Sequence, residues 1–127
     1  MRVLIAVSDK TIAADLAKIL QKNMYEVECI CSNTTDTINY VEALRPDLII
    51  MDVDLPGEFS AFDVTVYFND VFGIPVVYLT LQSSRYEIEE AIRTEPYGFL
   101  SECCNEEQIY ITLELAYNKY AESFYLL

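Results

Sequence analysis

Residues 44–57, LRPDLIIMDVDLPG, carry the clearest indication of the fold. The centre of this stretch, residues 48–51, is a short and fully apolar run, with Pro46 before it and a Pro-Gly turn signal at 56–57 after it. A run of this kind is typical of a β-strand that is covered on both faces, as in a parallel sheet. Asp52 and Asp54 follow directly, so we expect carboxyl groups where this strand ends.

The same pattern repeats on both sides of that stretch. Short apolar runs predict strands over residues 3–7, 25–31, 48–51, 74–79 and 97–100. Helical periodicity or capping signals predict helices over residues 12–20, 34–44, 61–71, 84–94 and from 105 onward. The last two begin with capping boxes, Ser84 with Glu87 and Asn105 with Gln108. Five such alternations predict an α/β fold, a flavodoxin-like (βα)₅ doubly wound parallel sheet with strand order 2-1-3-4-5.

Size and composition fit one globular unit. The chain has 127 residues, of which 53% are hydrophobic and 23% charged, so we expect a single domain over 1–127. No apolar run approaches the roughly 20 residues of a membrane span. The opening residues do not resemble a signal peptide, and we expect a cytoplasmic protein. The sequence leaves open whether 1–127 is the N-terminal domain of a longer protein.

The charge and the reactive residue types exclude several functions. Net charge is −13, which disfavours binding to nucleic acid or to an anionic membrane surface. The chain has no histidine, so histidine-based acid–base and nucleophilic catalysis is excluded. Its four cysteines lack the Cys-x-x-Cys spacing of zinc sites, and we expect free thiols at Cys29, Cys31, Cys103 and Cys104.

Polar residues gather where the predicted strands end. In a sheet of this kind the working site lies beyond the carboxyl ends of the strands, at the switch point between the first and third strands. Ser8 and Asp9 follow the first strand, Asp52 and Asp54 the third, and Thr80 the fourth. Ser101 and Glu102 follow the fifth strand. We therefore expect these side chains to face one another at one edge of the sheet.

Three segments resemble the receiver domains of two-component response regulators, of the chemotaxis-regulator type. Residues 44–57 resemble the third strand and phosphorylation loop of that family, and 74–80 (IPVVYLT) its fourth strand with a switch threonine. Residues 96–100 (PYGFL) resemble its fifth strand with a switch aromatic residue. The resemblance covers almost the whole chain. It implies a signalling module rather than an enzyme, and a phosphorelay in which a histidine kinase or another signalling protein is the partner.

The resemblance assigns roles to three residues. Asp52 occupies the position of the phospho-acceptor, Thr80 that of the switch hydroxyl and Phe99 that of the switch aromatic side chain. In the family, Mg²⁺ held by carboxylates neutralises the incoming phosphoryl group and a lysine binds it afterwards. Motion of the threonine and the aromatic residue then alters the face formed by the fourth helix, fifth strand and fifth helix. Phe99 is explained equally well as part of the core.

Four positions depart from the family pattern. Val7 and Ser8 stand where the family has an acidic pair, and Glu102 stands where it has a lysine. Leu81 replaces the small residue after the switch threonine and is expected to crowd the phosphoryl pocket. We therefore expect phosphorylation and Mg²⁺ binding to be weak.

The remaining metal ligands would be Asp52, Asp54 and Asp9. Asp9 is interpreted mainly as a helix cap, with a shifted metal ligand as the alternative. Asp54 can be interpreted equally well as a metal ligand or as an exposed loop residue.

Three functions remain in view. The first is a phospho-accepting receiver with an altered metal site, and the second is a pseudo-receiver that binds a partner without phosphate. The third, an electron-transfer flavodoxin, is disfavoured because residues 8–11 (SDKT) contain no glycine. Apolar residues outside the inward stripe of the last helix (Tyr110, Ile111 and Leu115) and the tail at 124–127 predict a protein contact, either a homodimer or another protein, through the fourth helix, fifth strand and fifth helix.

Overall fold

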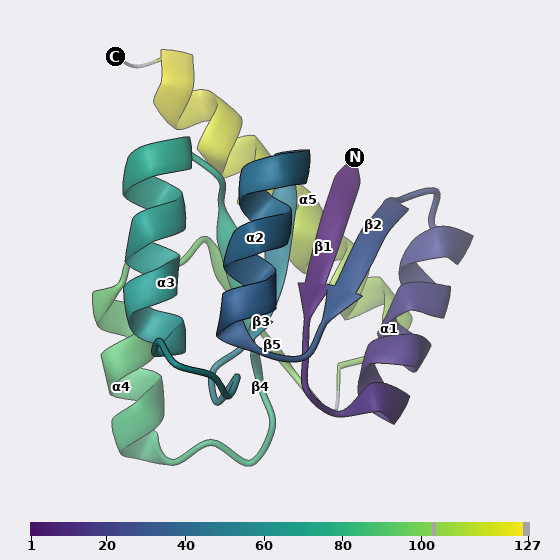
Figure 1. The fold of residues 1–127 in the computed structure, drawn as a ribbon. Coiled ribbons are helices and arrows are strands. Elements are labelled where there is room, and N and C mark those ends of the chain that lie inside the picture. The colour runs from purple at the N-terminus through teal and green to yellow at the C-terminus, as the bar shows by residue number, and fades with distance from the viewer. Residues whose placement is uncertain (103, 126–127) are drawn as a thin grey trace.

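The computed structural model describes residues 1–102 and 104–125, with side chains described as far as Ala121. A central sheet is covered by helices on both faces (Figure 1). The sheet has the strand order β2-β1-β3-β4-β5, and every neighbouring pair is parallel. The predicted flavodoxin-like (βα)₅ topology is therefore confirmed. The strands are β1 Arg2–Ala6, β2 Glu26–Cys31, β3 Leu48–Asp52, β4 Val76–Thr80 and β5 Gly98–Ser101.

The helices form two layers. They are α1 Lys10–Lys22, α2 Thr34–Leu44, α3 Ala61–Tyr67 with the π-helical turn η1 Phe68–Phe72, α4 Arg85–Arg93 and α5 Glu106–Tyr125. One core cluster joins the sheet to α1 and α5, through side chains such as Leu16 and Leu113. The other joins it to α2, α3 and α4, through Val41, Val64 and Ala91. β3 lies between these layers with all five of its residues buried, as its uninterrupted apolar run predicts.

Element boundaries differ from the sequence prediction in two informative places. The helix predicted over 61–71 changes at Phe68 from α-helical to π-helical winding and ends at Gly73, which has a left-handed φ of 62°. Phe68 itself is completely buried. β4 begins at Val76 rather than at 74, because Pro75 has no N–H group to donate to a neighbouring strand.

The loop after β3 is held against the start of α2. Gly57 has φ 142°, and a Cβ atom there would lie 2.2 Å from Thr34 Oγ1. The carbonyl of Pro56 accepts a hydrogen bond of 2.9 Å from the Thr34 N–H. Only glycine satisfies both the backbone conformation and the close approach. The Pro-Gly pair therefore fixes the path of the loop that leaves Asp52.

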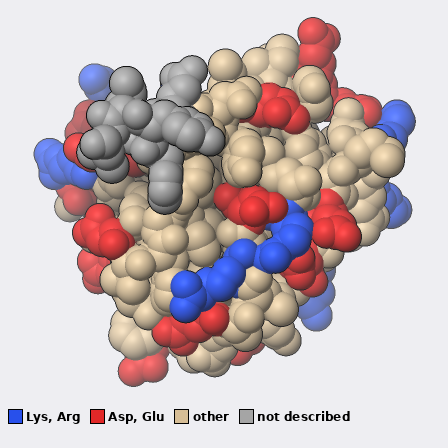
Figure 2. Space-filling view, turned by 90° about the horizontal axis from the view of Figure 1, so that it is seen from above, with Lys and Arg blue, Asp and Glu red and all other residues tan. Residues whose placement is uncertain are grey.

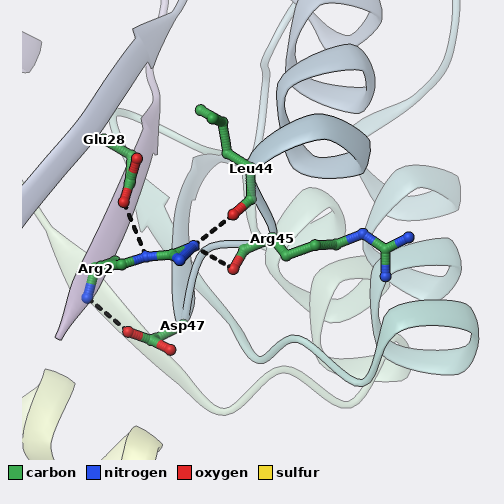
Figure 3. A network of polar contacts seen from close by, with 5 residues as sticks. All are labelled: Arg2, Glu28, Leu44, Arg45 and Asp47. Carbon is green, nitrogen blue, oxygen red and sulfur yellow. Dashed lines mark hydrogen bonds and ion pairs between the residues drawn. The ribbon is translucent and has the colours of Figure 1, made fainter.

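A polar network links the strands at the end of the sheet opposite to Asp52 (Figure 3). The Arg2 guanidinium forms an ion pair with Glu28 at 2.8 Å and also donates to the carbonyls of Leu44 and Arg45 at the end of α2. The Arg2 backbone N–H donates to Asp47 at 2.7 Å. One side chain thus caps α2 and links β1 to β2. Seen from above in Figure 2, basic side chains form a short band between acidic ones on this face.

Among the described residues, no helix is both long and apolar enough to cross a membrane. Several large apolar side chains are nevertheless exposed. Tyr110, Ile111 and Leu115 on α5 are 45%, 45% and 54% exposed, so their predicted position outside the core is confirmed. The side chains of the tail at 124–127 lie outside the described residues, as does Cys103.

Candidate functional site

Asp52 is the last residue of β3, and all five strands end at this same edge (Figure 1). It is only 3% exposed, as buried as the apolar residues of β3 that precede it. One carboxylate oxygen, Oδ1, accepts a 2.9 Å hydrogen bond from the backbone N–H of Asp54. The Ser8 hydroxyl donates a second hydrogen bond to this carboxylate. The carboxyl group is therefore held in place by the two segments that follow β1 and β3.

The surroundings of Asp52 disfavour its negative charge. Burial raises the pKa of its carboxyl group, while the hydrogen bonds from Asp54 and Ser8 act in the opposite direction. The negative charges of Asp9 and Glu87 raise the pKa further, and the net direction is upward. An added cation at this edge would therefore relieve an existing accumulation of negative charge.

Asp54 is paired with Glu87, a residue whose spacing from Ser84 predicts a helix cap. Its side chain shares a hydrogen bond with Glu87 of α4, which raises the pKa of Asp54 to about 6, with contributions from burial and from the charges of Glu87 and Asp52. The same hydrogen bond lowers the pKa of Glu87. When the pair holds one proton, below about pH 6, Asp54 carries it and donates to the Glu87 carboxylate.

Glu87 also completes the capping box with Ser84 that the sequence predicts. The Ser84 N–H donates to Glu87 Oε1 at 3.0 Å, and the Glu87 N–H donates to Ser84 Oγ at 3.1 Å. The order of the elements also indicates the contact between Glu87 and Asp54. Because α4 begins just after β4, the first turn of α4 lies at the same sheet edge as Asp52 and Asp54.

Asp9 caps α1, as its main interpretation predicts. Its Oδ1 accepts hydrogen bonds from the N–H groups of Thr11 and Ile12 at 3.0 and 3.1 Å. Val7 is the first of the two residues that stand where the family has an acidic pair. It is 1% exposed and belongs to the core cluster beneath α1. Its backbone N–H donates to the Cys31 carbonyl at 3.0 Å. The hydrogen bond that the segment after β1 gives Asp52 therefore comes from the neutral Ser8 hydroxyl, whereas Asp9 acts on Asp52 through its charge.

The candidate switch residues Thr80 and Phe99 lie on β4 and β5, and each strand is followed by a residue that departs from the family pattern. The Thr80 hydroxyl donates to the Leu100 carbonyl at 3.2 Å, across to β5. The Phe99 ring is partly buried and lies 5.7 Å from the Tyr78 ring, centroid to centroid, in a tilted contact. Leu81 packs against the core cluster of α1 and α5. Glu102 is exposed and lines a hollow beside Asp15 of α1.

We tested whether these residues fit a magnesium ion. Their oxygen donors are of the type that Mg²⁺ prefers, but Mg²⁺ also demands near-octahedral ligand geometry. Asp9 is engaged by two backbone N–H groups and Asp54 by Glu87. Within residues 1–102 and 104–125, no group of three or more Asp, Glu, Cys or His side chains is arranged to hold a metal. The described residues therefore do not form a ready-made magnesium site.

The pH dependence of stability provides a test of the Asp54–Glu87 pair. The pKa of Asp54 is raised from 3.8 to about 6 in the folded chain, so its contribution to stability is fully present below about pH 4 and lost as the pH rises through 6. Asp54→Asn retains a hydrogen-bond donor without this titration. Between pH 5 and pH 7.5, the free energy of unfolding should therefore fall more in the wild type than in Asp54→Asn. Urea denaturation at the two pH values measures the free energy of unfolding of each protein.

The control for that experiment is Glu58→Gln, which removes an exposed acid from the same loop. It should follow the wild type at both pH values. An equal pH response in the wild type and in Asp54→Asn would show that Asp54 does not hold the shared proton.

Comparison with known proteins identifies relatives of this arrangement. The sequence profile described as "response regulator receiver domain" matches residues 3–114. The chain is 29% identical over 121 residues to the transcriptional regulatory protein PdtaR of Mycobacterium tuberculosis, covering 95% of this chain and 58% of PdtaR. It is 30% identical over 106 residues to the fimbriae Z protein of Escherichia coli K12, covering 80% of this chain and 49% of that protein. The chain thus spans about half the length of these curated relatives.

Two solved structures show the same fold. The N-terminal domain of a response regulator/sensory box/GGDEF 3-domain protein from Carboxydothermus hydrogenoformans superposes with a TM-score of 0.86 at 26% identity, over 98% of this chain and 99% of that one. The signal receiver domain of a modulated diguanylate cyclase from Desulfovibrio desulfuricans G20 gives a TM-score of 0.89 at 22% identity, over 96% and 97%.

Proposed function

The chain belongs to the response regulator receiver domain family, and from this premise we propose that Asp52 is its phospho-acceptor. As a receiver domain it is a module of two-component signal transduction rather than an enzyme. The observation that supports the assignment is the position of Asp52, which is buried at the end of the central strand and hydrogen-bonded from both neighbouring segments. The donor would be a phosphohistidine of a histidine kinase in the cytoplasm.

The proposed phosphorylation is weak. A carboxylate attacks a phosphoryl group poorly unless the negative charge around it is neutralised. Receiver domains typically use Mg²⁺ for this, and here Asp9 and Asp54 have other partners while Val7 and Ser8 supply no charge. Glu102 adds a negative charge where the family provides a lysine. Magnesium binding would require Asp54 to leave Glu87, at a cost in affinity.

The experiment is phosphoryl labelling by acetyl phosphate with Mg²⁺, followed by intact mass spectrometry of the wild type and of Asp52→Asn. We expect a slow gain of one phosphoryl group in the wild type and none in the variant. Equal labelling of both proteins would place the acceptor at another residue.

A second candidate function is a pseudo-receiver, a protein-interaction module that works without phosphate. The observation that favours it is the engagement of both spare carboxyl groups, Asp9 with the start of α1 and Asp54 with Glu87. Such a module would retain the fold and the contact surface of a receiver while its output no longer depends on phosphorylation.

We propose that either function uses exposed apolar side chains on α4 and α5 for a homodimer or another protein contact. Tyr86 and Ile92 on α4 are 70% and 55% exposed, and Ile111 and Leu115 on α5 are similarly open. Patches of this kind mark interaction sites. With a net charge of −13, nucleic acid and anionic membranes are poor partners for the chain.

For the self-association alternative, the sedimentation coefficient of the wild type should rise with concentration, and Ile111→Lys should abolish that rise. A lysine at Val71, which is 62% exposed on η1, is the matched control and should leave association unchanged. A wild type that stays monomeric at every concentration would exclude the homodimer and leave the contact to another protein.

A further inference from the structure

Two thiols lie side by side on the edge strand of the sheet. Cys29 and Cys31 of β2 point to the same side of the strand, and their Sγ atoms are 3.7 Å apart. Cys31 is 3% exposed, and Cys29 is partly buried against the core of α2 and α3. Both are free cysteines. The receiver chemistry proposed above uses neither of them.

The strand is irregular directly before Cys29, whereas residues 29–31 pair in regular register with residues 4–6 of β1. β1 residues Val3 and Leu4 are adjacent, but their partners on β2 are Val27 and Cys29, so Glu28 is an extra residue in the ladder. Such a bulge bends a strand and disrupts its local pairing. β2 is also the first strand in the sheet order and has a neighbour only on the β1 side. The backbone around Cys29 is therefore less constrained than that of an inner strand.

Strand geometry sets the strain of a bond between these two sulfurs. Residues two apart in a regular strand have Cα atoms about 6.6 Å apart. Disulfides accept Cα separations of about 4.4–6.8 Å. A Cys29–Cys31 bond therefore lies near the upper limit and requires the strand to shorten locally, which the bulge and the free edge permit. Strained disulfides are easily reduced, a property of regulatory rather than structural ones.

We propose that Cys29 and Cys31 are a reversible redox modification site that closes to an intrachain disulfide by exchange with a low-molecular-weight disulfide. The Cys29 thiolate attacks one sulfur of the small disulfide, and the other sulfur leaves as a thiolate. The Cys31 thiolate then attacks Cys29 Sγ and releases the second small thiolate. The two cysteines lose two electrons and two protons, and the small disulfide becomes two thiols.

The surroundings of the two thiols determine the rate of this oxidation. Burial raises the pKa of Cys29, and burial together with the neighbouring Cys29 raises the pKa of Cys31 to about 12. Both groups are therefore protonated at neutral pH, and the thiolate is the attacking species. Oxidation should be slow at pH 7 and faster at pH 9. Above pH 9 the rate should continue to rise, whereas the rate for an exposed thiol of ordinary acidity, with a pKa of about 8.5, levels off.

The modification would act on the end of β1. The Cys31 carbonyl accepts the hydrogen bond from the Val7 N–H at 3.0 Å, and the next residue, Ser8, hydrogen-bonds Asp52. Shortening β2 between Cys29 and Cys31 displaces this carbonyl and with it the Val7–Ser8 segment. The consequence for phosphorylation rests on the proposed function of Asp52, whereas the disulfide itself does not.

The test uses Cys103→Ser/Cys104→Ser, which leaves only the β2 pair. This variant is treated with oxidised glutathione and followed by intact mass and free-thiol titration. We expect the loss of two hydrogen atoms without retained glutathione, full reversal by dithiothreitol, and a faster reaction at pH 9. Adding Cys31→Ser should stop the reaction at a glutathione adduct on Cys29. Peptide mapping of the oxidised wild type provides a second measurement that does not depend on the folding of the variant.

Two persisting thiols, one glutathione on each cysteine, or a disulfide between two chains would overturn the proposal. Amide NMR shifts of Val7 and Ser8 report on the coupling without any phosphoryl donor. These amides should shift on oxidation and return on reduction, while the amide of Ala91 on α4 serves as the distant control. Disulfide formation without a shift at Val7 and Ser8 would disprove the link to the Asp52 site.

Discussion

Ser8→Asp is expected to strengthen Mg²⁺ binding by about tenfold or more, because ligand charge strongly tunes the affinity of an oxygen site for a divalent cation. Position 8 already faces the site, since the Ser8 hydroxyl donates to Asp52. A carboxylate there would place a second charged oxygen ligand beside Asp52 without requiring Asp54 to leave Glu87. Isothermal titration with MgCl₂ measures the change.

Ser8→Asn is the matched control for this prediction. It has nearly the shape of aspartate but adds no charge, so its Mg²⁺ affinity should stay close to that of the wild type. An equal gain in Ser8→Asp and Ser8→Asn would show that shape rather than charge limits the site. No gain in Ser8→Asp would show that the missing carboxylate after β1 is not the main defect.

Glu102→Lys is expected to increase the rate at which acetyl phosphate labels Asp52, by about tenfold, which corresponds to about 1.4 kcal/mol in the barrier. The substitution replaces an anion by a cation at the position where the family binds the product phosphoryl group. Glu102 is exposed, so the lysine can be introduced without repacking the core. Time-resolved intact mass spectrometry at fixed Mg²⁺ gives the rate.

Glu102→Gln separates repulsion from attraction in that experiment. If removing the negative charge is enough, Gln and Lys should accelerate labelling equally. If the ammonium group contributes, Lys should exceed Gln, and raising the salt concentration should reduce the difference because exposed charges are screened. Unchanged rates in both variants would show that Glu102 does not face the phosphoryl group.

The sequence was most informative where a single physical requirement determined the structure. The apolar run of 48–51 predicted a strand covered on both faces, and β3 is buried throughout. Capping signals were equally local: Ser84 with Glu87 and Asn105 with Gln108 form the reciprocal hydrogen bonds that the spacing predicts. Asp9 likewise caps α1, its main interpretation.

Contacts between distant segments were not predictable in the same way. The Asp54–Glu87 hydrogen bond joins the loop after β3 to the first turn of α4, and its existence depends on the spacing between two elements rather than on either sequence alone. The π-helical turn at Phe68–Phe72 was not predictable from the sequence either. Phe68 is buried by tertiary packing, which the helical periodicity of the sequence does not indicate. The bulge before Cys29 also arises from pairing with β1.

We infer that Asp52 accepts a phosphoryl group poorly because the neighbouring carboxyl groups of Asp9 and Asp54 have other partners. The most direct test of this inference is the labelling rate of Asp52 as a function of Mg²⁺ concentration in the wild type and in Ser8→Asp, with Asp52→Asn as the blank. We expect slow labelling of the wild type, at a rate that is still rising at high Mg²⁺. Labelling of Ser8→Asp should be faster and saturate at lower Mg²⁺, and the blank should show none. Rapid labelling of the wild type that saturates at low Mg²⁺, or a labelled Asp52→Asn, would contradict this inference.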